Sequence, residues 1–525
     1  MKFIEKADEH LAAHESLLAQ VELSGGILGV LENHGVVFAR SLLERNQSDD
    51  NNGKDKKEEE TKTKKKLVKL VCGGGSGHEP SHNGFVGKGM LSASVNGRVF
   101  SSPSSSSVLA AIVSVASPNC LLMDEPKISE EWENDVLVIV KNYTGDRLNF
   151  GVAVEKAKGL GIGVEMVIVD DDSSIPRGQS AAGRRGLAGT LFIHKIAGAL
   201  ASQGEELSKI VEIIHEVISN IGTVGVSLCQ QKESNEEEDH EEQKKEKKDK
   251  GDKEETKDYF ELGLGIHGEP GYTKIKKDSI SNIITKILDT ILDNTPSRGY
   301  FQPPLEKGED VAMIINNLGG ISMLEFSIIS KKAIHQVESR GFNVRRAYSG
   351  HLMSSLDMPG FSITLLRLNH SKYNLISALD YSVEVTSWPT VCYKKDPEIK
   401  ILNLNLSSLL NTSSSTQVIQ NLSSTGEKFK NILTSVCNSL IEAEPILTEY
   451  DKKVGDGDCG ETFKIGAEGL LSKKDEIPFD QPKVAFEKIS EIIQEKMGGS
   501  SGFIYFILFY FILFYFISKK KKSAL

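Results

Sequence analysis

Four short apolar runs in this chain each end in a loop of small and polar residues. LVKLV, which begins at Leu67, leads into GGGSGHEP, and DVLVIV, which begins at Asp135, leads into KNYTGD. VEMVIV and DVAMII lead in the same way into DDDSS and NNLGG. Short runs rich in β-branched residues indicate buried strands. Helical patterns lie between them, at residues 150–160, 190–203 and 210–218, so the alternation predicts an α/β fold with parallel strands.

The loop after the first run contains Gly75, Ser76, Gly77 and His78. In parallel sheets ligands bind beyond the carboxyl ends of the strands, and this loop is expected at such an end. Its glycines are compatible with a tight structural turn or with a phosphate cradle. The loop has the spacing of neither common nucleotide-binding glycine motif, and its polar side chains suit the recognition of hydroxyl and carbonyl groups.

Lys141 and Asp146 lie in the loop after the second run. A carboxylate beside a reacting hydroxyl can take its proton during phosphoryl transfer, and a lysine can donate to a substrate oxygen. The hexapeptide KNYTGD taken alone is more typical of an exposed turn held by an Asn or Asp side chain.

His267 lies between glycines in the run LGLGIHGEPG. Glycine carries no bulk, so a small molecule could approach this imidazole closely. A neutral imidazole nitrogen can add to the carbonyl carbon of a ketone or aldehyde and form a hemiaminal, a reaction closed to glycerol because it has no carbonyl group. A single histidine without such a context is more often structural.

A cluster of carboxylates marks the second part of the chain. DKKVGDGDCG places Asp451, Asp456 and Asp458 within eight residues, where they repel one another unless a cation neutralises them. Oxygen ligands suit Mg²⁺, which also binds nucleotide phosphates. The cluster is not an EF-hand loop, because Thr462 stands where that loop has its glutamate. CGETF, which follows, favours a helix whose N-terminus could face phosphate, and MGGSSG at residues 497–502 suits close approach of phosphate or adenine.

Charge and cysteine usage exclude several classes of protein. The formal net charge of −11 disfavours nucleic acid as a main partner. The six cysteines are scattered without a CxxC pair, and the N-terminus shows no secretory signal, which predicts a cytoplasmic protein without a disulfide framework. Two charged tracts, residues 46–66 and 231–258, cannot bury apolar area and are expected to be solvated insertions.

The composition predicts a first domain at residues 1–392, a linker at 393–415, a helical domain at 416–502 and a tail at 503–525. The helical prediction rests on FKNILTSVCNSLIEAEPILTEY, whose apolar residues recur every three or four positions. The tail contains an unbroken aromatic and aliphatic run that as a helix would span about 22 Å, short of a hydrocarbon core of about 30 Å. We interpret it first as a translated non-coding or misjoined segment, then as a short membrane anchor, and last as a core helix.

In this order the motifs resemble a single-chain dihydroxyacetone kinase, also called glycerone kinase or triokinase. GGGSGHEP, GFVGKGML, VKNYTGDRLNFG, GLGIHGEPG, NNLGG and SLDMPGFS resemble the substrate domain of that family, and KVGDGDCG and MGGSSG resemble its nucleotide domain. The resemblance implies an α/β substrate domain with parallel-strand sheets, followed by an all-α nucleotide-binding domain. The family's nucleotide domain continues well beyond MGGSSG, so we expect this domain to be incomplete here.

The resemblance also implies a role for each motif residue. The triose would be bound by Gly75, Ser76, Gly77, His78, Lys141 and Asp146. The catalytic residues would be His267 as the hemiaminal nucleophile, Asp146 as the base and His78 as a hydrogen-bonding group. Mg²⁺ or Mn²⁺ would be held by Asp451, Asp456 and Asp458. ATP would be bound by Asp456, Gly457, Asp458, Cys459, Ser500 and Ser501.

The implied function is ATP-dependent phosphorylation of dihydroxyacetone, and of glyceraldehyde, by a homodimer that binds neither nucleic acid nor, unless the tail is genuine, a membrane. Two alternatives remain. The chain could be a carbonyl-binding regulatory or partner-dependent protein without kinase activity, which the incomplete nucleotide domain favours. It could also share the FAD-AMP lyase activity of some family members, which forms cyclic FMN. The intact aspartate cluster favours the kinase.

Overall fold

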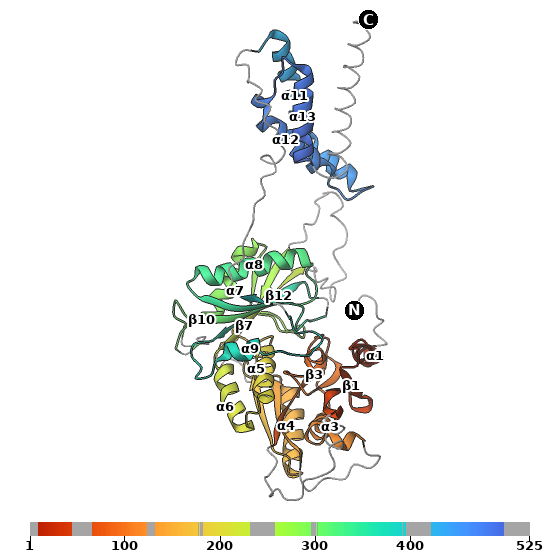
Figure 1. The fold of residues 1–525 in the computed structure, drawn as a ribbon, viewed down its shortest axis with the longest axis vertical. Helices are drawn as coiled ribbons and strands as arrows, with labels where there is room; N and C mark the ends of the chain where they lie inside the picture. The colour runs from red at the N-terminus through yellow and green to blue at the C-terminus, as the bar shows by residue number, and fades with distance from the viewer. Residues whose placement is uncertain are drawn as a thin grey trace, which may run out of the picture. The chain divides into compact units, whose positions relative to one another are not determined.

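The computed structural model describes residues 9–44, 66–122, 132–176, 178, 182–230, 258–295, 301, 303–356, 358–390, 392–394 and 422–497. Contacts divide the chain into two compact units, Met1–Ile399 and Lys400–Leu525. Figure 1 shows that the first unit is built from two sheets with helices and that the second is helical. The predicted fold class, an α/β domain followed by an all-α domain, is confirmed.

The first sheet has six strands in the order β1-β2-β4-β3-β5-β6. Their bounds are β1 Leu28–Leu31, β2 Val36–Ala39, β3 Leu67–Ser76, β4 Ala93–Val99, β5 Asn134–Lys141 and β6 Val164–Val169. β4, β3, β5 and β6 pair in parallel, as predicted, whereas β1, β2 and β4 pair antiparallel. The parallel pairing brings the carboxyl ends of β3 and β5, and the loops that follow them, to the same edge of the sheet.

The second sheet has seven strands in the order β13-β11-β10-β12-β7-β8-β9. Their bounds are β7 Ile221–Gln230, β8 Asp258–Leu262, β9 Thr273–Lys276, β10 Asp310–Asn317, β11 Asn343–Gly350, β12 Gly360–Arg367 and β13 Tyr393–Lys394. Among these strands only β10 and β11 pair in parallel, so the prediction of parallel strands is wrong for this sheet. The reason is its connectivity, because β7, β8 and β9 follow one another as hairpins, and strands joined in this way run antiparallel.

The helices of the first unit are α1 Glu9–Glu22, α2 Ser41–Glu44, α3 Ser105–Ala116, α4 Thr144–Gly159, α5 Thr190–Ser202, α6 Leu207–Ile218, α7 Ile280–Ile291, α8 Met323–Ser339 and α9 Leu375–Asp380. Short 3-10 helices are η2 Glu32–His34, η4 Asn83–Phe85 and η5 Pro118–Leu122. The three predicted helices are confirmed as α4, α5 and α6. α4 begins earlier than predicted, directly after β5, and its first turn therefore carries Asp146.

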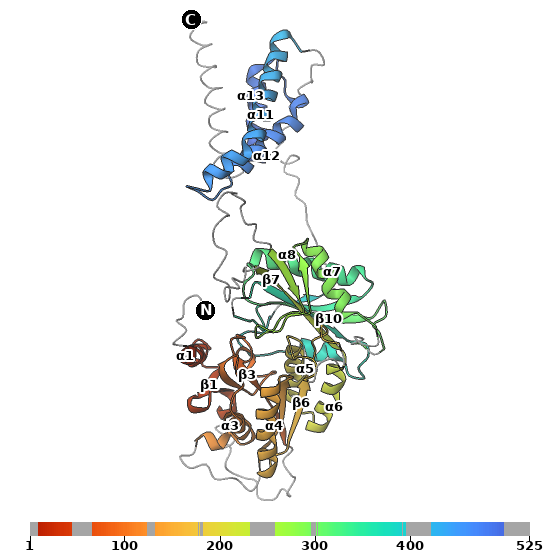
Figure 2. The same ribbon diagram turned by 180° about the vertical axis from the view of Figure 1, so that it is seen from behind.

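The helices pack their apolar faces on the two sheets and form layers over them. α3 and α4 pack on one face of the first sheet, and α5 and α6 pack on its other face. α7 and α8 cover the second sheet, as the reverse view in Figure 2 also shows. α7 buries Ile283, Ile287 and Ile291, which recur at helical spacing. Ser279 caps the start of this helix, because its side chain accepts a hydrogen bond from the Asn282 backbone N–H.

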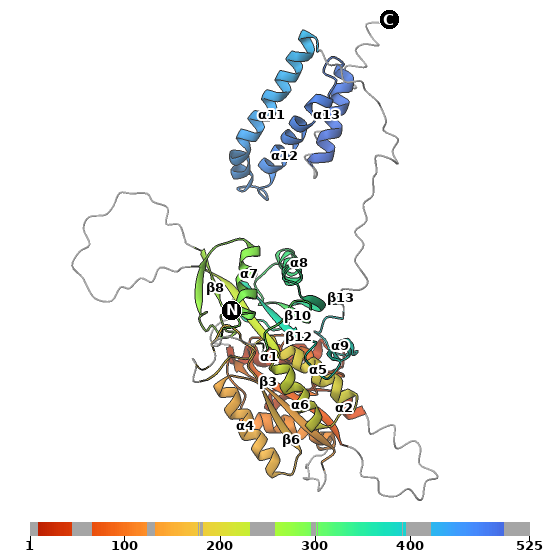
Figure 3. The same ribbon diagram turned by 90° about the vertical axis from the view of Figure 1, so that its left-hand side faces the viewer.

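The two charged tracts fall between elements of the first unit. The tract at 231–258 follows β7 in the sequence and leads to β8, which Figure 3 labels. Gln230 of β7 pairs with Asp258 of β8. Since both strands are already paired at this point, the tract is not needed to complete the sheet. Apart from Asp258 and Lys66, the residues of both tracts lie outside the described ones.

The second unit contains α11 Ser424–Asp451, α12 Cys459–Ser472, the short η6 Lys474–Glu476 and α13 Pro482–Lys496. Its core includes Cys437, Ala467, Phe479 and Ile489. The predicted linker begins with β13, which pairs with β11 of the second sheet; most of the linker and all of the tail at 503–525 lie outside the described residues. Within the described part of the chain, no helix is long and apolar enough to cross a membrane.

Two helical glycines of the first unit offer a matched test of this packing. A Cβ at Gly198 in α5 would lie 2.3 Å from the Gly89 carbonyl oxygen, whereas a Cβ at Gly151 in α4 would have no atom within 4 Å. We expect Gly198→Ala to lower the free energy of unfolding by about 1–3 kcal/mol through overpacking. Gly151→Ala should raise it by about 0.5–1 kcal/mol, since alanine favours the helix.

The measurement is urea unfolding followed by tryptophan fluorescence. Both tryptophans of the chain, Trp132 and Trp388, lie in the first unit and report on it. Equal effects of the two substitutions would contradict the close contact between α5 and the backbone at Gly89.

Candidate active site

Three aromatic rings surround the imidazole of His267. Its ring centroid lies 4.5 Å from that of Tyr143, 4.7 Å from that of His78 and 5.5 Å from that of Phe100, and each ring meets it nearly edge-on. Tyr143 comes from the loop after β5, Phe100 follows β4, and His78 follows β3. The structure therefore brings together His78 and His267, the two histidines that the sequence singled out.

Glu269 determines which nitrogen of His267 is free. Its carboxylate lies 3.1 Å from Nδ1 of His267 and also accepts a hydrogen bond from the His267 backbone N–H. Burial disfavours the charged form of Glu269, but the hydrogen bonds from His267 outweigh it and lower the pKa of this carboxyl to about 2. An ionised carboxylate can only accept, so Nδ1 is the nitrogen that carries a proton, and in the neutral form of the ring Nε2 is the nitrogen with the lone pair.

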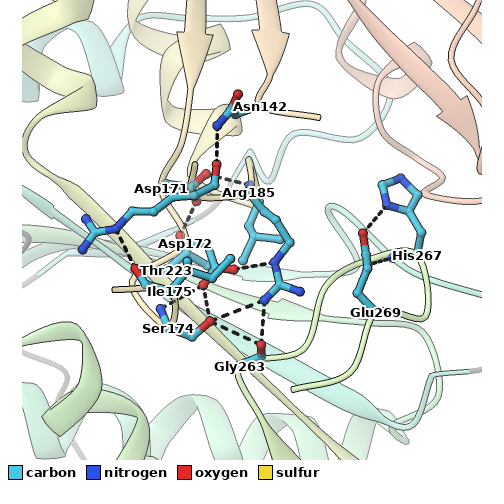
Figure 4. Close-up of polar contacts among 12 residues, drawn as sticks. Asn142, Asp171, Asp172, Ser174, Ile175, Arg185, Thr223, Gly263, His267 and Glu269 are labelled. Carbon is cyan, nitrogen blue, oxygen red and sulfur yellow. Dashed lines mark hydrogen bonds and ion pairs between the residues drawn. The ribbon is translucent and has the colours of Figure 1, made fainter. Parts of the chain in front are cut away.

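Arg185 fixes the loop that carries His267, as Figure 4 shows. Its guanidinium donates to the Gly263 carbonyl oxygen at 2.7 Å and to the Asp172 carboxylate at 2.7 Å. Asp172 follows β6 and also accepts from the Ser174 backbone at 2.9 Å. Burial raises the pKa of Asp172, an effect that Arg185 partly offsets. The histidine loop is thereby tied to the end of the first sheet.

His78 is buried and offers one free nitrogen. Its Nδ1 lies 3.0 Å from the Ser354 carbonyl oxygen and must donate to it, while Nε2 has no hydrogen-bond partner among the described residues. Burial, followed by the charge of Lys141, lowers the pKa of His78 to about 3, so the ring is neutral. Nε2 is therefore an acceptor, and a ligand hydroxyl group can satisfy it.

Lys141 and Asp146 lie together at the carboxyl end of β5. Both side chains are buried, which excludes the exposed turn that the hexapeptide alone favoured. A Cβ at Gly74 would lie 2.7 Å from Nζ of Lys141 and 3.4 Å from Oδ2 of Asp146, so the ammonium and the carboxylate flank this glycine. Asp146 also accepts a hydrogen bond from the Ser102 hydroxyl.

The rest of the glycine-rich loop serves close packing. The Ser76 hydroxyl donates to the Gly97 carbonyl oxygen at 2.8 Å, so it is used within the protein. Gly77 has φ of +103°, and a Cβ there would lie 2.8 Å from the Phe100 ring. Phe100 itself has φ of +54°, an uncommon conformation for an aromatic residue. Because Gly77 has no side chain, the Phe100 ring can lie beside His78.

The three aspartates of the second unit also converge. Asp451 ends α11, Asp456 lies in the following loop, and Asp458 is the N-cap of α12. Their carboxylate oxygens lie within 4.8 Å of one another. The charge of Asp456 is the main cause that raises the pKa of Asp458, so the cluster holds repelling charge. Crowded oxygen ligands of this kind fit Mg²⁺.

Contacts within the second unit fix the loop around these aspartates. The Cys459 backbone N–H donates to Asp451 at 3.1 Å, and Gly457 has φ of +79°. Ser500 and Ser501, which were predicted to bind ATP, lie outside the described residues.

Sequence reasoning missed Tyr143, Glu269 and Phe100. Tyr143 and Glu269 lie inside the motifs KNYTGD and HGEPG, two residues from Lys141 and from His267, and this proximity was the available signal. Phe100 lies in no motif, and its place at the site depends on the pairing of β4 with β3.

Comparisons with known proteins agree with this arrangement. The Dak1 domain family matches residues 35–386 and the DAK2 domain family matches residues 453–523, which defines a two-domain protein of the Dak1–DAK2 class. The triokinase/FMN cyclase of Mus musculus is 39% identical over 439 residues, 83% of this chain and 70% of that protein. Dihydroxyacetone kinase 2 of Saccharomyces cerevisiae is 34% identical over 451 residues, with 84% and 70% covered. The chain belongs to the dihydroxyacetone kinase family.

Two solved structures are also similar. The dihydroxyacetone kinase of C. freundii in complex with AMP-PNP and Mg²⁺ has a TM-score of 0.60 at 33% identity, with 97% of this chain and 81% of that chain covered. The dihydroxyacetone kinase operon co-activator DhaQ has a TM-score of 0.54 at 27% identity, with 71% of this chain and 98% of that chain covered.

The buried histidines predict how stability depends on pH. Burial lowers the pKa of His78 and of His194 from 6.5 to about 3, so between these values the unfolded chain binds protons that the folded chain does not. The free energy of unfolding should therefore fall as the pH falls below 6.5, by about 2 kcal/mol for each of the two at pH 5. Burial raises the pKa of Asp171 to about 6, which opposes this by about 1 kcal/mol.

Urea midpoints from tryptophan fluorescence at pH 5 and pH 7.5 measure this difference. His194→Gln removes one buried imidazole and should make the midpoint depend less on pH, whatever its effect on stability at pH 7.5. An unchanged or increased stability of the unsubstituted chain at pH 5 would show that these rings are not held neutral by burial.

Proposed function

We propose that this chain transfers the γ-phosphoryl group of ATP to a hydroxyl group of dihydroxyacetone, with glyceraldehyde as a second acceptor, while the triose is held as a hemiaminal on His267. The observation that supports this most is the state of the His267 ring. Glu269 holds Nδ1 as the donor, which leaves Nε2 as the nucleophilic nitrogen of the neutral ring, and the buried His78 lies beside the ring with an unpartnered nitrogen.

The covalent step uses groups already in place. A bond forms between Nε2 of His267 and the carbonyl carbon, while the π-electron pair of the carbonyl moves to its oxygen, which takes up a proton from solvent water. The imidazole gains positive charge in this step, and the carboxylate of Glu269 stabilises that charge or takes the Nδ1 proton. Nε2 of His78 can accept a hydrogen bond from a triose hydroxyl group.

Lys141 and Asp146 are suited to the transfer itself. Asp146 takes the proton of the hydroxyl group that receives phosphate, because a carboxylate can act as general base when it lies within hydrogen-bond reach. Lys141, whose ammonium flanks Gly74 with Asp146, donates to a triose oxygen. Their common position at the carboxyl ends of β3 and β5 supports these roles.

We propose that Asp451, Asp456 and Asp458 hold Mg²⁺ or Mn²⁺ and that this cluster, with Gly457, Cys459, Ser500 and Ser501, binds the phosphates of ATP. The bound cation neutralises phosphate charge in this class of reaction. Support comes from the crowded carboxylates and from the likeness to the C. freundii kinase solved with AMP-PNP and Mg²⁺. Residues 1–392 would then form the substrate domain and residues 416–502 part of the nucleotide domain of a homodimer.

Two further functions have specific support. The similarity to the co-activator DhaQ covers 98% of that protein, which supports a carbonyl-binding regulatory role without kinase activity. The triokinase/FMN cyclase relatives support formation of cyclic FMN as an additional activity. The aspartate cluster favours the kinase over the regulatory role, since a protein that only binds a carbonyl compound has no need of it.

His267→Ala should abolish the covalent adduct, because alanine offers no nucleophile. Mass spectrometry of the intact full-length chain after incubation with dihydroxyacetone should show the added mass of one triose in the unsubstituted protein only. His215→Ala, which removes an exposed histidine from α6, should leave the adduct unchanged. An adduct of undiminished yield in His267→Ala would refute the assignment of the nucleophile.

Asp456→Asn should abolish ATP turnover while the triose adduct still forms, because the two sites lie in different units. It should also weaken the binding of Mn²⁺, which electron paramagnetic resonance measures without any need for turnover. If the unsubstituted chain forms the adduct but shows no turnover, the regulatory role is favoured. Full Mn²⁺ binding by Asp456→Asn would contradict the proposed metal site.

A further inference from the structure

A second pair of histidines is buried beside Lys141. His82 and His194 are 4% and 0% exposed, and their ring centroids lie 5.1 Å apart. Nδ1 of His82 and both ring nitrogens of His194 have no hydrogen-bond partner among the described residues. Unpartnered buried polar groups are rare and call for an explanation. The proposed function gives these residues no task.

With Cys72, the two histidines form a group whose possible metal-ligand atoms lie within 4.8 Å of one another. The position of Lys141 argues against a cation there. Nζ of Lys141 lies 2.9 Å from Nε2 of His82 and is itself buried. A second positive charge this close to a buried ammonium would be strongly repelled, since the interior screens charge weakly. The group therefore has to be explained together with Lys141.

The hydrogen bonds of Lys141 show what His82 does. An ammonium group has three N–H donors and no acceptor. One N–H donates to the Gly73 carbonyl oxygen at 3.1 Å, and another donates to Nε2 of His82 at 2.9 Å. The third has no partner among the described residues, and Nζ lies beside Gly74 at the site where Asp146 also points. Two fixed hydrogen bonds thus orient the remaining one.

His82 is a neutral partner of this ammonium. Burial, followed by the charge of Lys141, lowers the pKa of His82 well below its ordinary value, with smaller effects from His194 and His78. Cys72, which packs nearby, is also uncharged, because burial raises the pKa of its thiol to about 12. A carboxylate that reached the position of Nε2, as glutamate could, would also orient Lys141 but would cancel its charge. A neutral imidazole orients the ammonium and leaves its charge for the substrate.

We propose that His82 is a positioning residue for Lys141: its neutral ring accepts one hydrogen bond from the ammonium and thereby directs the remaining N–H, with its full charge, at an oxygen of the bound triose. This inference rests on the proposed function, in which Lys141 contacts the triose. It adds His82 as the residue that directs the Lys141 N–H toward the triose and leaves the charge of the ammonium intact.

The test compares three substitutions at His82 in the full-length chain. His82→Leu removes the acceptor, and we expect triose binding to weaken by about tenfold to a hundredfold, as for a lost hydrogen bond to a charged group. His82→Gln restores a neutral acceptor and should recover most of the loss. His82→Glu restores an acceptor at the same reach as His82→Gln but cancels the charge, and should bind the triose as weakly as His82→Leu. Adduct yield as a function of dihydroxyacetone concentration gives each apparent affinity.

A double-mutant cycle with Lys141→Met separates positioning from a general structural effect. If His82 acts through Lys141, His82→Leu should change triose affinity little once Lys141 is absent. Equal losses with and without Lys141 would overturn the inference, as would an affinity of His82→Leu equal to that of the unsubstituted chain. Circular dichroism checks that each variant folds, and the comparison of His82→Gln with His82→Glu decides the matter if His82→Leu does not fold.

Two further outcomes separate a failure of the proposed function from a failure of the role of His82 alone. If the unsubstituted chain forms no adduct and binds no dihydroxyacetone by calorimetry, the proposed function fails and the role of His82 fails with it. If the purified, untagged chain carries stoichiometric zinc or copper that Cys72→Ser removes and that Cys437→Ser, a change at the buried cysteine of the other unit, does not, then the group is a metal site and the positioning role is wrong.

Discussion

The close approach of backbone and side chains to the glycines at the end of β3 determines where the other groups of the candidate site lie. A Cβ at Gly73 would lie 2.2 Å from the Val95 carbonyl oxygen of β4, and one at Gly75 would lie 2.6 Å from the Ser101 backbone nitrogen. Any larger residue would therefore push β4 away from β3. The same absence of side chains leaves room for Lys141 at Gly74, so one short segment positions both the strand that leads to Phe100 and the ammonium group.

The chemistry proposed for His267 depends on a second constraint, the geometry of a loop that belongs to the other sheet of the unit. The loop follows β8, yet its histidine meets rings that follow β3, β4 and β5. Arg185 spans this junction, because it bonds the Gly263 carbonyl oxygen on one side and Asp172 on the other. Within the loop Glu269 fixes the ring proton of His267. Arg185 thus fixes the position of the loop, whereas Glu269 selects the tautomer of His267.

The sequence was sufficient for those parts of the fold and site that depend on local pattern. The runs at β3, β5, β6 and β10 and the helices α4, α5 and α6 follow from the pattern of their apolar residues. The candidate roles of His78, Lys141, Asp146 and His267 came from the resemblance of their motifs to the dihydroxyacetone kinase family, because KNYTGD alone favoured an exposed turn. Strand direction in the second sheet could not be predicted, because it depends on which distant strands become neighbours. Phe100 and His82 were missed for the same reason, since their roles come from contacts with rings and an ammonium far away in the sequence.

Burial differs between the two candidate sites, and the difference fits the role proposed for each. In the first unit, desolvation keeps His78, His82 and His194 uncharged, which a nitrogen that accepts hydrogen bonds requires. In the second unit, Asp456 and Asp458 are exposed to water, so desolvation contributes less to the raised pKa of Asp458 than the charge of Asp456 does. Crowded carboxylates that stay in contact with water suit the cation site proposed for them. A buried carboxylate cluster would take up protons instead, and an exposed imidazole would be protonated in mild acid and lose its lone pair.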